Sequence, residues 1–210
     1  MKLISIGILI FGILVGTKSS AESTSSWKLQ KNSDGILIES RKEIGSEYHS
    51  FKASMILDTD LETIVKELKD VNEYPNWFAF TKSTFLIYQT KNEQIVFMET
   101  DFPWPYQNEF MEYRMVFLKE TNGTIHINID GITKSTEVKQ GLYPLKKAKG
   151  YIKLYPLSSD TKSQVKLVYF FHSEPGQEIP TWLINPMIHE MPYKTLMELR
   201  KRVCRDNCID

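Results

Sequence analysis

Short runs of alternating apolar and polar residues predict that most of the chain forms β-strands. Two runs flank the turn sequence Asn32–Gly35 and predict a hairpin, and a third strand is expected within residues 47–57. Asn122-Gly123 predicts another hairpin, with a type I′ turn. Residues 164–173 are apolar on both faces and predict an inner strand covered on both sides. The other predicted strands cover residues 81–89, 93–100, 109–118, 124–131 and 150–157.

One internal segment has the helical period instead. Its apolar residues recur at spacings of three and four, the pattern of an amphipathic helix. These residues are Leu61, Ile64, Val65 and Leu68. Thr59, followed three residues later by Glu62, is typical of a capping box at a helix start. We therefore predict a short helix that ends near Asp70.

A longer helix is predicted at the C-terminus, within residues 178–203. Pro186 and Pro192 lie inside this segment and should bend or interrupt it. The order is then strands, one short helix, many strands and one long helix. That order predicts an α+β fold with an antiparallel sheet.

The first residues have the features of a secretory signal peptide. Lys2 precedes an apolar run, and Ser19 and Ala21 occupy the small-residue positions of a cleavage site after Ala21. The run is shorter than the ~20 apolar residues of a membrane-spanning helix, although an uncleaved anchor is the alternative. We expect residues 1–21 to be removed, residues 22–26 to be a short disordered segment, residues 27–204 to form one domain and residues 205–210 to form a tail. The protein is expected to be exported, to the periplasm or outside the cell.

Charge and motif content narrow the function classes. The whole chain has 26 basic and 26 acidic residues, and removal of Lys2 and Lys18 leaves 24 against 26, a net charge of −2. A near-neutral domain lacks the basic surface that nucleic-acid binding requires, so no nucleic-acid partner is expected. The histidines are scattered, and neither HExxH nor GxSxG occurs. We therefore expect no catalytic residue, no metal site and no cofactor.

The two cysteines, Cys204 and Cys208, lie close together at the C-terminus. In an oxidising compartment this even count favours a local disulfide between them. Two cysteines without a nearby histidine do not make a zinc site. We interpret the pair as a staple at the end of the last helix.

Five short strings follow one another in a characteristic order along the chain. They are WKLQKNSDGILIESRK from Trp27, VNEYPNWF with Tyr74 and Trp77, PWPYQNEF from Pro103, GYIKLYP ending at Pro156, and EPGQEIPTWLINP from Glu174. Together they resemble the START family of lipid-binding domains. The resemblance covers Trp27 to Val203, which is nearly the whole expected domain.

The resemblance implies a helix-grip fold: a curved antiparallel β-sheet wrapped around the long C-terminal helix, with an internal hydrophobic cavity. Members of the family each bind one hydrophobic molecule there. The loop that contains Trp104, together with the C-terminal helix, would form the gate. Two positions depart from the family pattern. Gln107-Asn108-Glu109 lacks the arginine of the family's Asn-Arg-Asp, and Lys146 or Lys147 stands where a later strand usually carries arginine.

Candidate ligand-binding residues follow from the resemblance and from strand alternation. Glu99 and Arg114 resemble an acid and an arginine that meet a polar head group in some family members. The alternative is an outward-facing salt bridge, because Glu112 and Arg114 lie opposite the apolar face of their strand. The other candidates are apolar or aromatic and could line a cavity or fill a core: Trp104, Met111, Tyr113, Met115, Ile127, Tyr169, Phe171, Met187, Ile188 and Met191.

The expected function is the binding of one lipid or sterol-like molecule, for transfer or sensing, by an exported monomer that contacts membrane surfaces transiently. Two alternatives remain open at this point. The same fold hosts cyclases and hydrolases, in which Glu99 or Asp101 could act as a general base. A structural or assembly role with a filled cavity is the other alternative.

Overall fold

The computed structural model describes residues 25–133, 141–157 and 163–204. The predicted signal peptide, the predicted tail and Cys208 lie outside these residues. The expected disulfide between Cys204 and Cys208 therefore also lies outside the described residues. Within the described residues, ten strands form one sheet. Their bounds are β1 Lys28–Ser33, β2 Ile36–Lys42, β3 His49–Leu57, β4 Thr81–Gln89, β5 Glu93–Thr100, β6 Glu109–Lys119, β7 Ile125–Gly131, β8 Tyr143–Pro144, β9 Lys147–Leu157 and β10 Gln164–Glu174.

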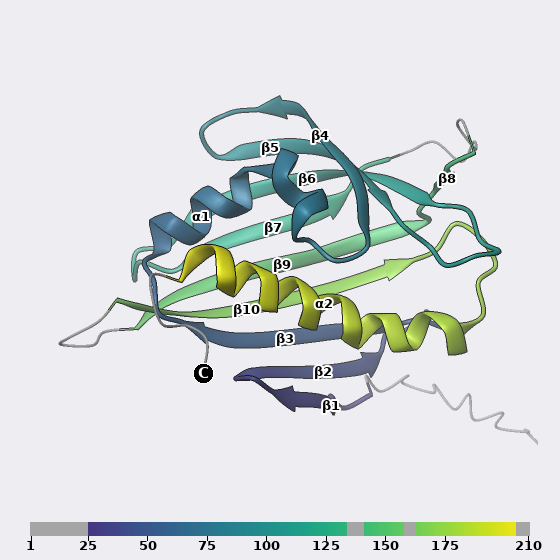
Figure 1. Cartoon of the computed structure of the whole chain (residues 1–210), viewed down its shortest axis with the longest axis horizontal. Helices are drawn as coiled ribbons and strands as arrows, with labels where there is room; N and C mark the ends of the chain where they lie inside the picture. The colour runs from purple at the N-terminus through teal and green to yellow at the C-terminus, as the bar shows by residue number, and fades with distance from the viewer. Residues whose placement is uncertain (1–24, 134–140, 158–162, 205–210) are drawn as a thin grey trace, which may run out of the picture.

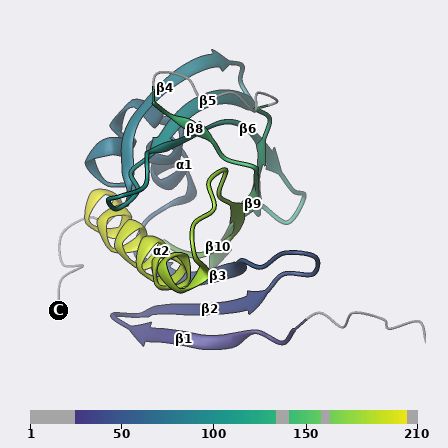
Figure 2. The ribbon, with the colours of Figure 1, turned by 90° about the vertical axis from the view of Figure 1, so that its right-hand side faces the viewer.

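The sheet is antiparallel in the order β1-β2-β3-β10-β9-β7-β6-β5-β4, and the short β8 pairs in parallel with β6. It curls so that its two halves face each other, and helix α2 (Thr181–Val203) lies across the open side (Figures 1 and 2). Helix α1 (Leu61–Lys69) and the 3-10 helix η1 (Val71–Asn76) pack near the C-terminal half of α2 (Figure 1). This arrangement confirms the predicted α+β fold with a curved antiparallel sheet around a long C-terminal helix.

Helix α1 begins differently from the prediction. Its N-cap is Asp60, whose Oδ1 accepts a hydrogen bond from the Thr63 backbone N–H at 2.8 Å. The predicted capping box at Thr59 is therefore wrong, and the Thr59 hydroxyl is buried without a hydrogen-bond partner. An aspartate is favoured here because its negative charge also suits the positive end of the helix dipole.

The hairpin between β6 and β7 forms as predicted, but its turn is not type I′. A type I′ turn requires positive φ at both central residues, and of Asn122 and Gly123 only Gly123 has it, at +85°. The Asn122 Oδ1 instead accepts from the Thr124 N–H at 2.8 Å, which holds Asn122 in an ordinary turn conformation. In the β1–β2 hairpin, by contrast, both Asp34 and Gly35 have the positive φ that a type I′ turn requires.

Strand β10 is an inner strand, as predicted, between β3 and β9. One of its faces is buried in the core. The other face was also predicted to be covered, but it is covered only in part, from the exposed Lys166 to the buried His172. On this face the Phe170 ring packs against Tyr151 at 5.2 Å and against Trp27 at 6.1 Å between ring centroids.

Helix α2 is one continuous helix that runs through Pro186 and Pro192, so the prolines do not interrupt it. Most of its fully buried residues lie in the C-terminal half, where Leu196, Leu199 and Val203 pack into the core. Within the described residues, no helix combines the length and the apolar character needed to cross a membrane.

Candidate functional site

A cavity lies between the concave face of the sheet and the N-terminal half of α2. Its empty volume is about 1130 Å³ with its open mouth included. The sheet contributes inward-facing side chains from β3, β5, β6, β7, β9 and β10, and the segment after η1 contributes Phe78 to Thr81. Helix α2 closes the cavity with Ile184, Met187, Ile188 and Met191. The cavity is therefore built mainly from apolar and aromatic side chains.

Strand alternation explains which residues reach the cavity. Along β6, Met111, Tyr113, Met115 and Phe117 all point inward and are buried. Tyr113 and Met115 line the cavity, whereas Met111 fills the core beside Gly131, where there is no room for a Cβ atom. The inward face could be read from the sequence, but not which of its members meet open space.

The apolar and aromatic residues predicted for the site fall into two groups, those that line the cavity and those that do not. Met111 and Ile127 are buried in the core and are not among the residues that line the cavity. Those that line it are Tyr113, Met115, Tyr169, Phe171, Met187, Ile188 and Met191. Ligand binding by these seven residues stays a prediction.

Glu99 and Arg114 do not meet in the cavity; of the two alternatives the outward-facing one fits, although Arg114 forms its salt bridge with Glu93 and not with Glu99. The Arg114 guanidinium is half-exposed and donates to Glu93 at 2.6 Å. Glu99 accepts from Asn108 at 2.7 Å and from Ser83 at 2.8 Å. The β5–β6 register runs without a bulge, so both side chains stay on the face opposite the cavity. As a result, no described residue that lines the cavity is Asp, Glu, Lys or Arg.

Trp104 projects from the loop between β5 and β6 and is 91 % exposed, so it neither lines the cavity nor plugs the core. Its neighbour Phe102 lines the cavity. Trp182, in the first turn of α2, is 74 % exposed. Two hydrogen bonds join the backbone of Gln107 to the side-chain amide of Gln177, at 3.1 and 2.8 Å. The two exposed tryptophans therefore come from segments that are tied together at the cavity mouth.

Glu109, at the start of β6, is a fully buried carboxylate that sequence reasoning missed. It accepts hydrogen bonds from the backbone N–H groups of Gly176 and Gln177, both at 3.0 Å, and from the Gln177 side chain at 3.1 Å. Burial raises the pKa of Glu109, and these hydrogen bonds oppose that shift. Gly176 is required because a Cβ atom there would lie 1.9 Å from the Pro144 carbonyl oxygen. Glu109 thus anchors the segment that leads into α2.

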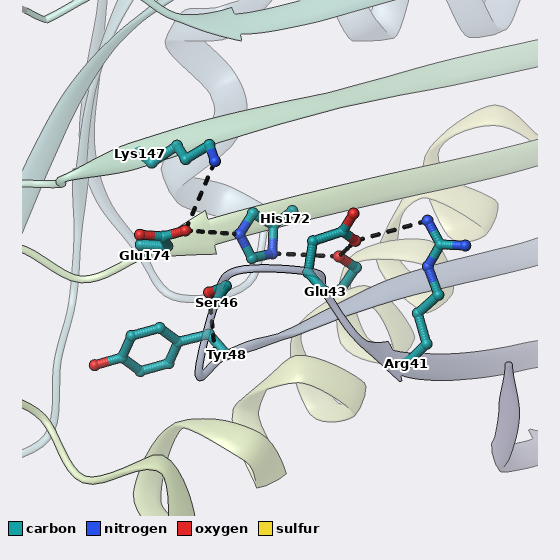
Figure 3. A network of polar contacts seen from close by, with 8 residues as sticks. Arg41, Glu43, Ser46, Tyr48, Lys147, His172 and Glu174 are labelled. Carbon is teal, nitrogen blue, oxygen red and sulfur yellow. Dashed lines mark hydrogen bonds and ion pairs between the residues drawn. The ribbon is translucent and has the colours of Figure 1, made fainter. Parts of the chain in front are cut away.

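A second polar network was also missed, and it centres on His172 (Figure 3). His172 and Ser50 are buried on the face of the sheet opposite the cavity, since their neighbours Phe171 and Phe51 line it. The Ser50 Oγ lies 2.5 Å from Glu43 and 3.2 Å from the His172 Nδ1, and the His172 Nε2 lies 3.2 Å from Glu174. These residues lie far apart in sequence, so no local motif indicates the network.

The ionisation of Glu43 and Glu174 decides which groups of this network donate and which accept. Burial opposes ionisation of Glu43, but the Ser50 hydrogen bond and the Arg41 charge bring its pKa below the usual value. Burial likewise opposes ionisation of Glu174, whose pKa is nevertheless lowered by hydrogen bonds from His172 and Ser46. Ionised carboxylates only accept hydrogen bonds, so Ser50 donates to Glu43 and accepts from Nδ1, while Nε2 donates to Glu174. With both carboxylates ionised, this pattern places a proton on each ring nitrogen of His172.

This network resembles a serine–histidine–acid arrangement but has the opposite hydrogen-bond direction. A nucleophilic serine gives its proton to the histidine. Ser50 gives its proton to Glu43 instead and has no exposed surface. The network is thus built to join the β2–β3 connection to the end of β10.

Comparisons with known proteins agree with this architecture. No family model matches the chain. A solved structure of a STAR-related lipid transfer protein from Xanthomonas axonopodis is 28% identical and has a TM-score of 0.75, covering 84% of this chain and 98% of that one. An uncharacterised protein of Pseudomonas aeruginosa is 25% identical over 174 residues, 83% of this chain and 85% of that protein. Human phosphatidylcholine transfer protein is 22% identical over 166 residues, 77% of this chain and 76% of that protein.

Proposed function

Because this chain belongs to the START family, whose fold is a lipid-binding and transfer fold, we propose that it holds one hydrophobic ligand in the cavity beneath α2. The observation that carries the proposal is the cavity lining, which is mainly apolar and aromatic and includes no Asp, Glu, Lys or Arg among the described residues. Burial of an apolar chain there is worth roughly 25 cal/mol per Å² removed from water. The shape of the cavity and a few polar groups would then select the ligand.

Exchange of the ligand requires movement at the mouth. The loop with Phe102 and the N-terminal half of α2 both line the cavity. Polar contacts through Gln177 and Glu109 join them to each other and to the sheet. Such contacts can be replaced by water when the mouth opens, whereas a buried apolar contact cannot. We therefore assign opening to this end of the cavity.

The exposed tryptophans support contact with a membrane during exchange. Trp104 and Trp182 project from the two segments that meet at the mouth. Tryptophan is enriched at membrane–water interfaces, where its ring is half in apolar surroundings and its N–H is hydrated. The proposed cycle is docking of a monomer by these two rings, passage of the lipid through the mouth, and release. The N-terminal signal sequence supports export as the setting for this cycle.

A carrier role is proposed in preference to an enzymatic one. Glu99, a candidate general base, accepts hydrogen bonds from Asn108 and Ser83 outside the cavity. Asp101 is exposed, and neither residue is among those that line the cavity. A general base must reach the proton that it removes, and no carboxylate of the described residues faces the ligand.

Native mass spectrometry of the protein purified from its own source tests the proposal directly. We expect one lipid to remain bound per protein, and to be exchanged for lipid from added vesicles. The companion variant Ile188→Trp fills the cavity from α2 and should lose the bound lipid while staying folded. A wild-type protein that carries no lipid, and takes up none from vesicles, would contradict the proposed function.

A further inference from the structure

We propose that the cavity selects an uncharged lipid with a hydrogen-bond acceptor along its buried part, and that the hydroxyls of Tyr113 and Tyr169 bind this acceptor. The inference rests on the proposed lipid-binding function and deepens it by naming the class of ligand. Tyr113 lies on β6 and Tyr169 lies on β10. Both side chains line the cavity.

The two tyrosines are buried but lack partners for their hydroxyls. Tyr113 is 6 % exposed and Tyr169 is 3 % exposed. Among the described residues, no side chain or backbone group pairs with either hydroxyl, and neither hydroxyl is fully enclosed by protein atoms, so both are reached from the cavity. Tyr74, a third tyrosine of the lining, differs because its hydroxyl donates to the Leu68 carbonyl oxygen at 2.6 Å. A tyrosine hydroxyl removed from bulk water normally finds a partner, so these two are free to pair with a molecule that enters the cavity.

The rings of Tyr113 and Tyr169 lie in the same region of the cavity, both beside one phenylalanine. The Phe171 ring centroid is 6.1 Å from the ring centroids of both Tyr113 and Tyr169. The phenols of Tyr113 and Tyr74 also act electrostatically on Tyr169. Burial raises the pKa of both unpaired phenols, so each keeps its proton and can donate it. One oxygen atom of a ligand, or two neighbouring ones, could accept from both.

The charge of the lining limits what the ligand can carry. No described lining residue is Lys or Arg, and the Nδ1 of the lining histidine, His49, lies 3.0 Å from the Asn185 Oδ1 and so already has a partner. Glu109, the carboxylate that acts on Tyr113, is already held by Gly176 and Gln177. A carboxylate or phosphate placed beside the tyrosines would be a buried anion without a counter-charge, which is strongly unfavourable. The carbonyl oxygen of an ester or ketone, or the hydroxyl oxygen of an alcohol, can accept a hydrogen bond from the tyrosines and carries no charge.

A matched series of four fluorescent probes tests the inference on the full mature chain. The probes are pyrenedecanoic acid methyl ester, pyrenedecanol, pyrenedecanoic acid at a pH where it is ionised, and decylpyrene, which has no acceptor. We expect the ester and the alcohol to bind at least about tenfold more tightly than the hydrocarbon, since each hydroxyl contributes one new hydrogen bond. The ionised acid should bind no better than the hydrocarbon.

Tyr113→Phe and Tyr169→Phe should each lower the affinity for the ester about fivefold and leave the affinity for decylpyrene unchanged. The double variant should bind all uncharged probes equally. Tyr151→Phe, which removes a hydroxyl from the opposite face of the sheet, is the control and should change nothing. In the ligand-free protein neither cavity variant should lower the melting temperature, whereas Tyr74→Phe should, because it removes a paired hydroxyl.

The outcomes separate the two proposals. Equal binding of ester and hydrocarbon by the wild type would overturn the role of the hydroxyls while leaving lipid binding intact. Binding of the ionised acid as tightly as the ester would overturn the selection for uncharged lipids. If none of the four probes binds, the lipid-binding function itself is contradicted, and this inference fails with it.

Discussion

Ser50 donates its only hydroxyl proton to Glu43, so the Ser50 oxygen is left to accept from the His172 Nδ1. The ring lies between two carboxylates, because the other ring nitrogen contacts Glu174. We expect ¹⁵N NMR at neutral pH to show both ring nitrogens of His172 protonated. One unprotonated nitrogen would contradict the hydrogen-bond directions.

Replacement of His172 should lower the free energy of unfolding. His172→Gln removes a charge and leaves two partly buried carboxylates facing one cation fewer, so a loss of about 3 kcal/mol in unfolding free energy is expected. His126→Gln is the matched control, because its Nε2 has no hydrogen-bond partner. It should change stability by less than about 1 kcal/mol. Equal effects of the two substitutions in urea unfolding would argue against the network.

The same network predicts how stability responds to acid. The pKa values of Glu43 and Glu174 are lowered in the folded state, from an ordinary value of 4.5. The unfolded chain therefore binds more protons than the folded one just below pH 4.5, and stability falls as pH falls through this window. Glu174→Gln should flatten this part of the curve of unfolding free energy against pH. An unchanged slope would show that Glu174 does not contribute.

Glu109 makes stability depend on pH in the opposite direction. Its pKa is raised by burial, so the folded state holds a proton that the unfolded chain has already released. Stability should therefore decline as pH rises from 4.5 through the raised pKa of Glu109. Glu109→Gln should abolish this decline and should also speed hydrogen exchange at the Gly176 and Gln177 amides, because one acceptor oxygen is lost. Slow exchange at both amides in the variant would contradict the anchoring role.

Trp104→Ala should impair lipid uptake more than stability. The ring is almost fully exposed, so its removal should change the unfolding free energy by no more than about 0.5 kcal/mol. Loss of its burial in a membrane interface, about 1 kcal/mol, should slow probe uptake from phosphatidylethanolamine–phosphatidylglycerol vesicles roughly fivefold. Phe85→Ala, another exposed aromatic residue but on β4, is the control and should not affect uptake. A large loss of stability with normal uptake would make Trp104 structural.

The sequence predicted the inner strands well, because strands such as β2, β3 and β6 alternate between a buried and a more exposed face. Residues 81–89 and 93–100 match β4 and β5. Tyr113 and Met115 were assigned to the inward face for the same reason. What alternation cannot show is which of the inward side chains meet a cavity, since this depends on how far α2 lies from each strand. Met111 and Tyr113 have the same parity, yet one fills the core and the other faces open space.

Polar contacts between distant residues were beyond sequence reasoning. Ser50 and His172 are separated by 122 residues, and Glu109 reaches a segment 67 residues away. Glu99 and Arg114 were candidates for a pair, but Glu99 accepts from Ser83, 16 residues away, and Arg114 donates to Glu93, 21 residues away. Charge and residue type indicate that such groups need partners, and only the fold decides which partners they receive.

Helix α2 has one half in the core and one half over the cavity. Leu196, Leu199 and Val203 hold its C-terminal half, while the cavity-lining residues lie between Ile184 and Met191. The C-terminal half of the helix is therefore held by the core, and the proposed opening would move the N-terminal half. Lifting the N-terminal half would admit a lipid without exposing the residues on which the stability of the fold depends, so a carrier of this design could open many times without passing through its unfolded state.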